Sequence, residues 1–139
     1  MIHKLTDGIV SAIRKEFGDG YEIYIENVEQ GLTEPCFLIT LANATMEHQI
    51  GTMYRFENLF LVQYFPASQE ARNECVSVQM RLYQALEYIK ADGWKRGEEM
   101  EGEMEEDVLH FQVQYNLLLQ KWQAAEVMEV LKTWIAAKA

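Results

Sequence analysis

The chain has 139 residues, of which 49% are hydrophobic and 12% aromatic, so it has enough apolar side chains to bury a core. Asp and Glu number 22 against 12 Lys and Arg, and the formal charge of −10 has the wrong sign for a protein that grips phosphate backbones. Sequence-specific nucleic-acid binding is therefore not expected, and the length predicts one domain over residues 1–139.

Neither a membrane span nor a secretory leader is evident. No apolar run approaches the roughly 18 residues that a bilayer-spanning helix needs, and the N-terminus lacks the charged, apolar and cleavage segments of an export signal. Cys36 and Cys75 lie far apart and outside any Cys-x-x-Cys spacing. We expect both thiols to be reduced and buried, in a cytoplasmic protein without a membrane partner.

The first part of the chain is expected to form a helix and then two antiparallel strands. Residues 2–17 place apolar side chains at helical spacing and end at a Gly-Asp-Gly turn. Residues 21–28 alternate between apolar and polar side chains, which is typical of a half-buried strand. After a loop containing glycine and proline, residues 36–42 predict the second strand.

A turn is predicted at residues 43–45, before a long segment rich in aromatic residues at 48–65. This segment is either one long strand or two collinear strands broken near Glu57 and Asn58. Its second half alternates between two apolar faces, so we expect both of its faces to be covered. That pattern indicates a central strand.

The second half of the chain is expected to add a helix, a hairpin and a final helix. Ser68 predicts the N-cap of a helix over 68–91, whose apolar residues step by three or four. Residues 94–104 and 108–119 predict a hairpin, and residues 122–137 a third helix. The order of helix, three strands, helix, two strands and helix indicates an α+β fold. It predicts an antiparallel or mixed sheet of about five strands with helices on one face.

An acidic run occupies residues 98–107, where seven of the ten side chains are acidic. Alternation along a strand predicts that Glu99, Glu101, Glu103 and Glu105 project from one face, roughly 7 Å apart. That spacing is too wide for one cation to bridge neighbours, so a solvated face that resists edge pairing is favoured over a metal site. A functional negative surface is the remaining interpretation.

No pattern typical of catalysis or nucleotide binding is present. His3, His48 and His110 are dispersed, and structural roles are favoured for all three. The chain has neither a Gly-x-Ser-x-Gly elbow nor a glycine-rich phosphate loop. We therefore predict no catalytic residues, no metal and no cofactor, although carboxylates distant in sequence could still meet in the fold.

Tyr54, Arg55 and Phe56 fall in the first half of the long predicted strand. Tyrosine and arginine are favoured at protein interfaces, and a domain of this size can hide only some of its aromatic side chains. We therefore hypothesise that these three residues form a subunit interface. Packing inside the core is the alternative for each of them.

Three segments stand out by their order and spacing: Val28–Phe37, with Gln-Gly-x-x-x-Pro-Cys-Phe, Phe60–Pro66, with Tyr-Phe-Pro, and Val108–Asn116. Together they resemble a family of small prophage proteins of Gram-positive bacteria, the phage tail-terminator-like proteins. The resemblance covers nearly the whole chain. In that family a basic residue often precedes the tyrosine of the long strand, whereas this chain has Met53 there.

The resemblance implies a non-enzymatic virion assembly protein, a tail terminator that caps the tail tube as a ring, typically a hexamer. The implied partners are further copies of the chain, the tail-tube protein and a head-completion protein. The implied location is the bacterial host cytoplasm during assembly and then the virion tail. If the acidic run lined the channel of the ring, like charge would keep DNA from sticking as it passes.

Two alternatives remain open. Within the same class, the chain is a head–tail connector or a tail-completion protein. From another class, it is a small cytoplasmic enzyme or ligand-binding domain that uses carboxylates brought together by the fold.

Overall fold

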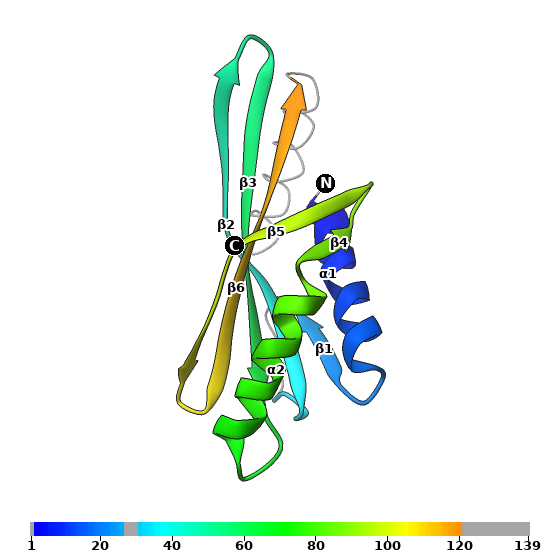
Figure 1. Cartoon of the computed structure of the whole chain (residues 1–139), viewed down its shortest axis with the longest axis vertical. Helices are drawn as coiled ribbons and strands as arrows, with labels where there is room; N and C mark the ends of the chain where they lie inside the picture. Colours follow the sequence, from blue (N-terminus) through cyan, green and yellow to red (C-terminus); the bar gives the residue numbers. More distant parts are fainter. Residues whose placement is uncertain (1, 27–30, 121–139) are drawn as a thin grey trace.

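The computed structural model describes residues 2–26 and 31–120 (Figure 1). The predicted third helix at 122–137 lies outside these residues. In chain order, the elements are α1 (Ile2–Phe17), β1 (Glu22–Ile25), β2 (Cys36–Ile50), β3 (Met53–Phe65), α2 (Ala71–Ala85), β4 (Tyr88–Lys90), β5 (Trp94–Glu105) and β6 (Val108–Gln120).

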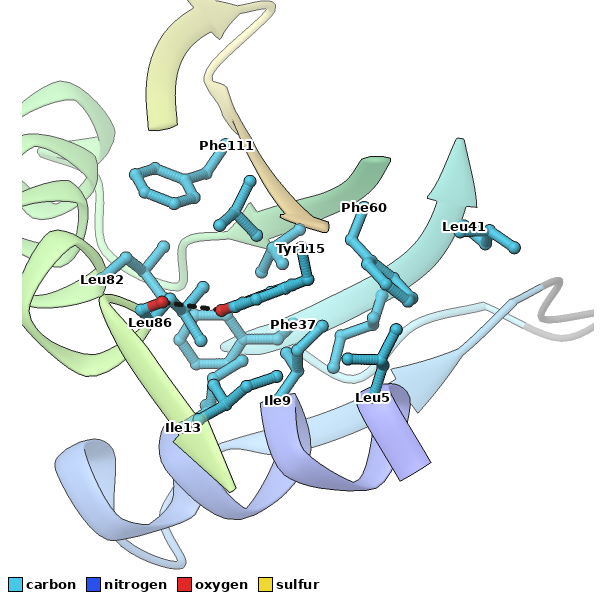
Figure 2. Packing of buried hydrophobic residues seen from close by; sticks show 14 of the residues in the cluster. Leu5, Ile9, Ile13, Phe37, Leu41, Phe60, Leu82, Leu86, Phe111 and Tyr115 are labelled. Carbon is cyan, nitrogen blue, oxygen red and sulfur yellow. Dashed lines mark hydrogen bonds between the residues drawn. The ribbon is translucent and has the colours of Figure 1, made fainter. Parts of the chain in front are cut away.

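The described strands form one mixed sheet in the order β1-β2-β3-β6-β5-β4. Both described helices lie against the same face of it, and their apolar side chains enter one core cluster with those of the strands (Figures 1 and 2). The α+β class with helices on one face is therefore confirmed. The sheet has six strands within the described residues, one more than expected, because β4 was predicted as part of a helix.

The pairing of β1 with β2 is parallel, which corrects the expected antiparallel pair. Glu22 at the start of β1 lies opposite Cys36 at the start of β2. Glu26 ends β1 with a φ of +63°. Its backbone amide donates to the carbonyl of Ile39 at 2.9 Å, and its carboxylate accepts from the amide of Leu41 at 3.3 Å. Because β1 ends at this turn, it pairs only with Cys36–Ile39 at the start of β2.

Strands β2 and β3 form one long hairpin, where a turn at 43–45 was predicted. The prediction is wrong because β2 continues through that segment to Ile50, and the chain reverses at Gly51 and Thr52. Gly51 has a φ of +58°, which two-residue hairpin loops require and glycine adopts at little steric cost. Strand β3 passes Glu57 without a break and lies between β2 and β6, so the prediction of a central strand is confirmed.

Alternation along the central strands builds the core on the helix-covered face. In β3 the even-numbered residues from Phe56 to Tyr64 are buried, and in β6 the odd-numbered residues from Leu109 to Leu119 are buried. Tyr115 lies among the side chains of both helices, and its hydroxyl donates to the carbonyl of Leu86 at 2.7 Å (Figure 2). Burial raises the pKa of the Tyr115 hydroxyl far above its usual range, so this bond is made by the neutral side chain.

The opposite face of β3 is less covered than predicted. Leu59, Leu61 and Phe65 are only half-buried, because no helix or strand among the described residues packs over them. Full cover on both faces, the expectation for the second half of this strand, is therefore not found in the described part of the chain. We call this side of the sheet the open face.

Helix α2 begins later than predicted. It starts at Ala71, and no side chain caps its N-terminus, so Ser68 is not the cap. Glu74 in the first turn instead accepts from the amides of Ala67 and Ser68 in the preceding loop, at 3.2 and 3.1 Å. It also accepts a short hydrogen bond from the hydroxyl of Tyr64. One carboxylate thus ties the end of β3, the following loop and α2 together.

Helix α2 also ends earlier than predicted, at Ala85. The predicted apolar stripe is confirmed for its buried members Cys75, Val78 and Leu82. Asp92 and Gly93 both have positive φ, +58° and +100°, and they reverse the chain between β4 and β5. An Asp-Gly pair favours a hairpin turn as well as a helix stop, and here it forms the hairpin.

Candidate assembly surfaces

The open face of the sheet changes in character from β3 to β5. Leu61 of β3 pairs with Gln112 of β6, whose side-chain amide donates to Glu101 of β5 at 3.0 Å. One row along, the side-chain amide of Gln63 donates to Nδ1 of His110 at 3.2 Å. His110 thus lies on the open face, away from the core. Apolar groups beside hydrogen-bonded polar groups are typical of protein interfaces.

The hairpin formed by residues 42–58, which we call the arm, extends beyond the two described helices at one end of the sheet (Figure 1). Two of the three predicted interface residues share a face of it. Tyr54 and Phe56 lie on the helix side, and Arg55 lies on the open face, where its Nε is 3.0 Å from the carboxylate of Glu57. The ring of Tyr54 lies 5.1 Å from that of His48.

Burial separates the same three residues in another way. Phe56 is fully buried in the core, whereas Tyr54 and Arg55 are partly exposed. Only Tyr54 and Arg55 therefore present side-chain surface to a partner. Ile50 at the end of the arm and Leu118 beside it on β6 are 76% and 67% exposed, which is unusual for aliphatic side chains of this size. The arm thus combines exposed apolar and polar groups.

Acidic side chains line the open face of β5, but one of the four residues expected there is replaced by another. A bulge lies between Glu98 and Glu101, and Glu99 sits in it with a φ of +53°. Because a bulge inserts one extra residue, it shifts the alternation of side chains. Glu98 therefore joins Glu101, Glu103 and Glu105 on the open face in place of Glu99. All five carboxylates are exposed, so the strand is a negative surface on both sides of the bulge.

A surface pocket of about 410 Å³ lies between α1 and β4. Its lining includes Lys15, Glu16 and Trp94, and Nε of Arg81 lies 3.2 Å from the carboxylate of Glu16. Tyr88 and Trp94 on its rim are 52% and 68% exposed. The sequence interpretation missed this aromatic rim because it placed residue 88 in a helix. The Asp-Gly pair that follows was the available signal for a hairpin there.

The two thiols are free and buried, which confirms the expectation for both. Burial, with the nearby charges of Glu34 and Glu22, raises the pKa of Cys36 to about 11. Burial also raises the pKa of Cys75. Among residues 2–26 and 31–120, no three His, Cys, Asp or Glu side chains gather closely enough to hold a metal ion. Neither described helix has the length and apolar character needed to cross a bilayer.

A protein family described as phage tail terminator protein matches residues 4–126 of the chain. No curated protein sequence matches the chain. The matched segment runs from the first turn of α1 past the end of β6, so it contains the open face, the arm, the acidic strand and the aromatic rim.

Proposed function

The chain belongs to a family of phage tail terminator proteins, and from this premise we propose that it ends tail growth by closing a ring of six copies on the last ring of the tail tube. Membership makes it a structural protein of the virion tail, which works in contact with other tail and head proteins. The observation that carries the proposal is the match over residues 4–126, which includes all the described strands.

The shape of the subunit suits a cap. A head-to-tail contact between identical copies closes into a ring when its rotation divides a full turn, and such a ring does not propagate along the tube. The described chain is elongated, with the arm at one end and the turn between β5 and β6 at the other (Figure 1). That turn is acidic, with Glu105, Glu106 and Asp107, whereas Ile50 and Gly51 form the end of the arm. Chemically different ends allow one side to bind the tube protein and the other to receive a head-completion protein.

Within the ring, the exposed parts of Tyr54 and Arg55, on opposite faces of the arm, contact the neighbouring copy, and Phe56 anchors this part of β3 in the core. The acidic strand, with Glu98, Glu99, Glu101, Glu103 and Glu105, faces the channel. Its negative charge lowers the adhesion of DNA to the wall. An assembled ring with this strand on the outer rim would contradict the placement of the acidic surface without affecting the capping function.

Deletion of the gene from the prophage tests the function. After induction, we expect electron microscopy to show overlong tails that are not joined to heads, and the unaltered chain supplied in trans should restore normal length. Tails of normal length that fail to join heads would instead assign the chain as a head–tail connector or tail-completion protein. Normal tails joined to heads would overturn the proposal.

The site of assembly can be followed in the same cells. Assembly takes place in the bacterial host cytoplasm, and the protein remains in the tail. We therefore expect the chain in the cytoplasmic fraction early after induction and in purified virions later. Virions without the chain would contradict its place in the finished tail.

A further inference from the structure

One edge of strand β2 has no partner along most of its length within the described residues. β1 pairs with that edge only from Cys36 to Ile39, and Glu26 adds one bond to Leu41. Beyond this point, residues 42–50 pair with β3 on one side, and no described strand lies on the other. An unpaired strand edge is a template for another strand.

The register shows which backbone groups face this edge. Strand residues direct both their N–H and C=O groups to alternate sides. The carbonyl of Ile39 and the amide of Leu41 both face β1, and a one-residue bulge follows before Asn43. The bulge reverses the alternation, so the edge groups beyond it belong to Ala44, Met46 and His48, whereas Asn43, Thr45 and Glu47 bond to β3.

A second such edge lies on the opposite side of the same three strands. Strand β6 pairs with β5 only as far as Tyr115, where β5 diverges to pair with β4. β6 nevertheless continues along the arm, with Leu119 opposite Tyr54 of β3. Residues 116–119 therefore have β3 on one side and no described strand on the other. Within the described residues, unpaired edges therefore lie along residues 42–50 of β2 and residues 116–119 of β6, in addition to the acidic outer edge of β5 beyond its pairing with β4.

The two edges run in directions that match. β2 and β6 are both antiparallel to β3, so they are parallel to each other. Copies related by rotation about an axis along the strands keep that direction. A neighbour's β6 would then run parallel to β2, as β1 already does on the earlier part of the same edge.

In the part of the chain that the structure describes, the β2 edge also lacks the protection that natural edges carry. Charged residues, proline and cover by other elements are the usual means of blocking an edge. Residues 42–50 contain no lysine, arginine or proline, and Glu47 is their only acid. Its exposed side chains at the end of the arm include the apolar Ile50. This composition permits pairing.

We propose that neighbouring copies join edge to edge beside their arms. Residues 116–119 of β6 in one copy add a parallel strand to residues 44–48 of β2 in the next copy. The inference rests on the proposed ring and specifies its contact. Each copy offers both edges, so the contact is head-to-tail and repeats until the ring closes.

Proline at residue 46 tests this contact. Met46→Pro removes an edge-facing N–H that bonds to no described strand, and proline is tolerated at such positions. Met46→Ala removes the same side chain but keeps the N–H, so it is the matched control. We expect sedimentation velocity, with the chain alone and with purified tail tubes, to show about tenfold weaker assembly for Met46→Pro than for Met46→Ala. Equal thermal midpoints of the two monomers establish that both variants fold.

Hydrogen exchange of the unaltered chain gives a second measurement. Amides of residues 44–48 should become protected when the ring forms. Rings that form without this protection, and equally well from both variants, would overturn the edge contact and leave the capping function intact. If the amides of residues 44–48 became protected on tubes although the copies did not contact one another, this edge would bind the tube protein, and the inference would be overturned. Failure of the unaltered chain to assemble at all, alone or on tubes, would overturn the proposed ring as well.

Discussion

The two long hairpins of the sheet are built alike but carry different side chains. Each reverses at a two-residue turn with positive φ, at Gly51 in the first and at Glu106 and Asp107 in the second, and each contains a bulge. The outer strand of the first hairpin carries one acid over residues 42–50, whereas that of the second carries five over residues 98–105. Similar backbones can therefore end a sheet or leave it open to continuation, depending on the charge of the outer strand.

The two outer strands, β5 and β2, also differ in how other elements pack against them. Strand β4 pairs with the start of β5, and α2 packs close to its later part. At Gly102 a Cβ atom would lie 2.7 Å from the side-chain amide of Gln79, which shows how closely the helix approaches. No described element approaches the edge of β2 beyond Leu41 in this way. The acidic strand therefore carries charge along its outer edge and packs against α2 on its core face, whereas the β2 edge of the arm has one acid, Glu47, and no described element against it.

The largest expected effect distinguishes the two faces of β3, the strand that pairs with β2 in the first hairpin. Phe60 is 1% exposed in the core, and its neighbour Leu61 is half-buried on the open face. Phe60→Ala should lower the free energy of unfolding by about 3–5 kcal/mol because it leaves a cavity among fixed neighbours. Leu61→Ala should cost about 1 kcal/mol, since part of that side chain is already in water. Urea denaturation of both monomers measures the difference, and equal losses would show that the open face is packed as tightly as the core.

The next largest effect contrasts glycines of the two hairpins. At Gly97 of β5, a Cβ atom would lie 2.5 Å from the carbonyl oxygen of Leu86 and 2.9 Å from Val113. At Gly51 in the arm, an added Cβ atom would meet no other part of the chain within 4 Å, but the backbone φ is +58°. We expect Gly97→Ala to cost about 3 kcal/mol through overpacking and Gly51→Ala about 1 kcal/mol through backbone strain.

Thermal unfolding of these two variants distinguishes the causes. If Gly51→Ala were the more damaging variant, the end of the arm would be under tighter constraint than the covered strand. The contrast between an open arm and an enclosed β5 would then be wrong.

Elements with a clear local signal were predictable from the sequence. Helix α1, the buried stripe of α2 and the hairpin of β5 and β6 follow from periodicity, because the less exposed side chains of each recur on one face. The direction of β1 was not predictable, since alternation of side chains is the same in a parallel and in an antiparallel pair. The turn at Gly51 was missed because Asn43 and its neighbours suggested an earlier turn, although these residues fit a strand whose outer edge is solvated.

The candidate surfaces were predictable in composition but not in geometry. The run of acids located the negative strand, yet the bulge that exchanges Glu98 for Glu99 has no clear local signal, because it arises from the pairing with β6. Phe56 and Arg55 were placed in the right strand, but their opposite faces follow only from the register with β6. Free edges of a sheet depend on strand order, which a single sequence does not reveal.

A smaller effect is expected in the loop that joins β3 to α2. Burial acts to raise the pKa of Glu74, but hydrogen bonds from Tyr64 and from Ser68 and Ala67 outweigh it and lower the pKa below its usual value. A carboxylate whose pKa is lowered on folding contributes stability at neutral pH, and that contribution disappears as pH falls through the folded pKa.

Glu74→Gln tests this contribution. We expect a loss of about 1–2 kcal/mol at neutral pH and a flatter decline of stability on acidification than in the unaltered chain. Urea midpoints measured from neutral to acidic pH give both quantities. Tyr64→Phe, which removes only one donor, should show an intermediate loss, and parallel pH profiles for all three proteins would contradict the assignment.

The smallest effect on stability is expected from neutralising the acidic strand, and it tests the comparison of the two hairpins directly. Glu101→Gln, Glu103→Gln and Glu105→Gln together should change the free energy of unfolding by no more than about 0.5 kcal/mol, because the side chains are exposed. They should nevertheless increase self-association at low salt, measured by light scattering, because the strand then lacks the charge that opposes wrong pairing.

Net charge alone could produce the same result, so the control removes three exposed acids elsewhere, with Asp7→Asn, Asp19→Asn and Glu22→Gln. Both triple variants lose the same formal charge and keep the same surface in other respects. If the charge on β5 acts locally, only the first associates more strongly. The difference should shrink as salt screens the unaltered strand, since the Debye length falls to about 3 Å at 1 M. Equal association of both variants would mean that the net charge of the molecule limits self-association, and that the charge on the edge of β5 has no separate effect.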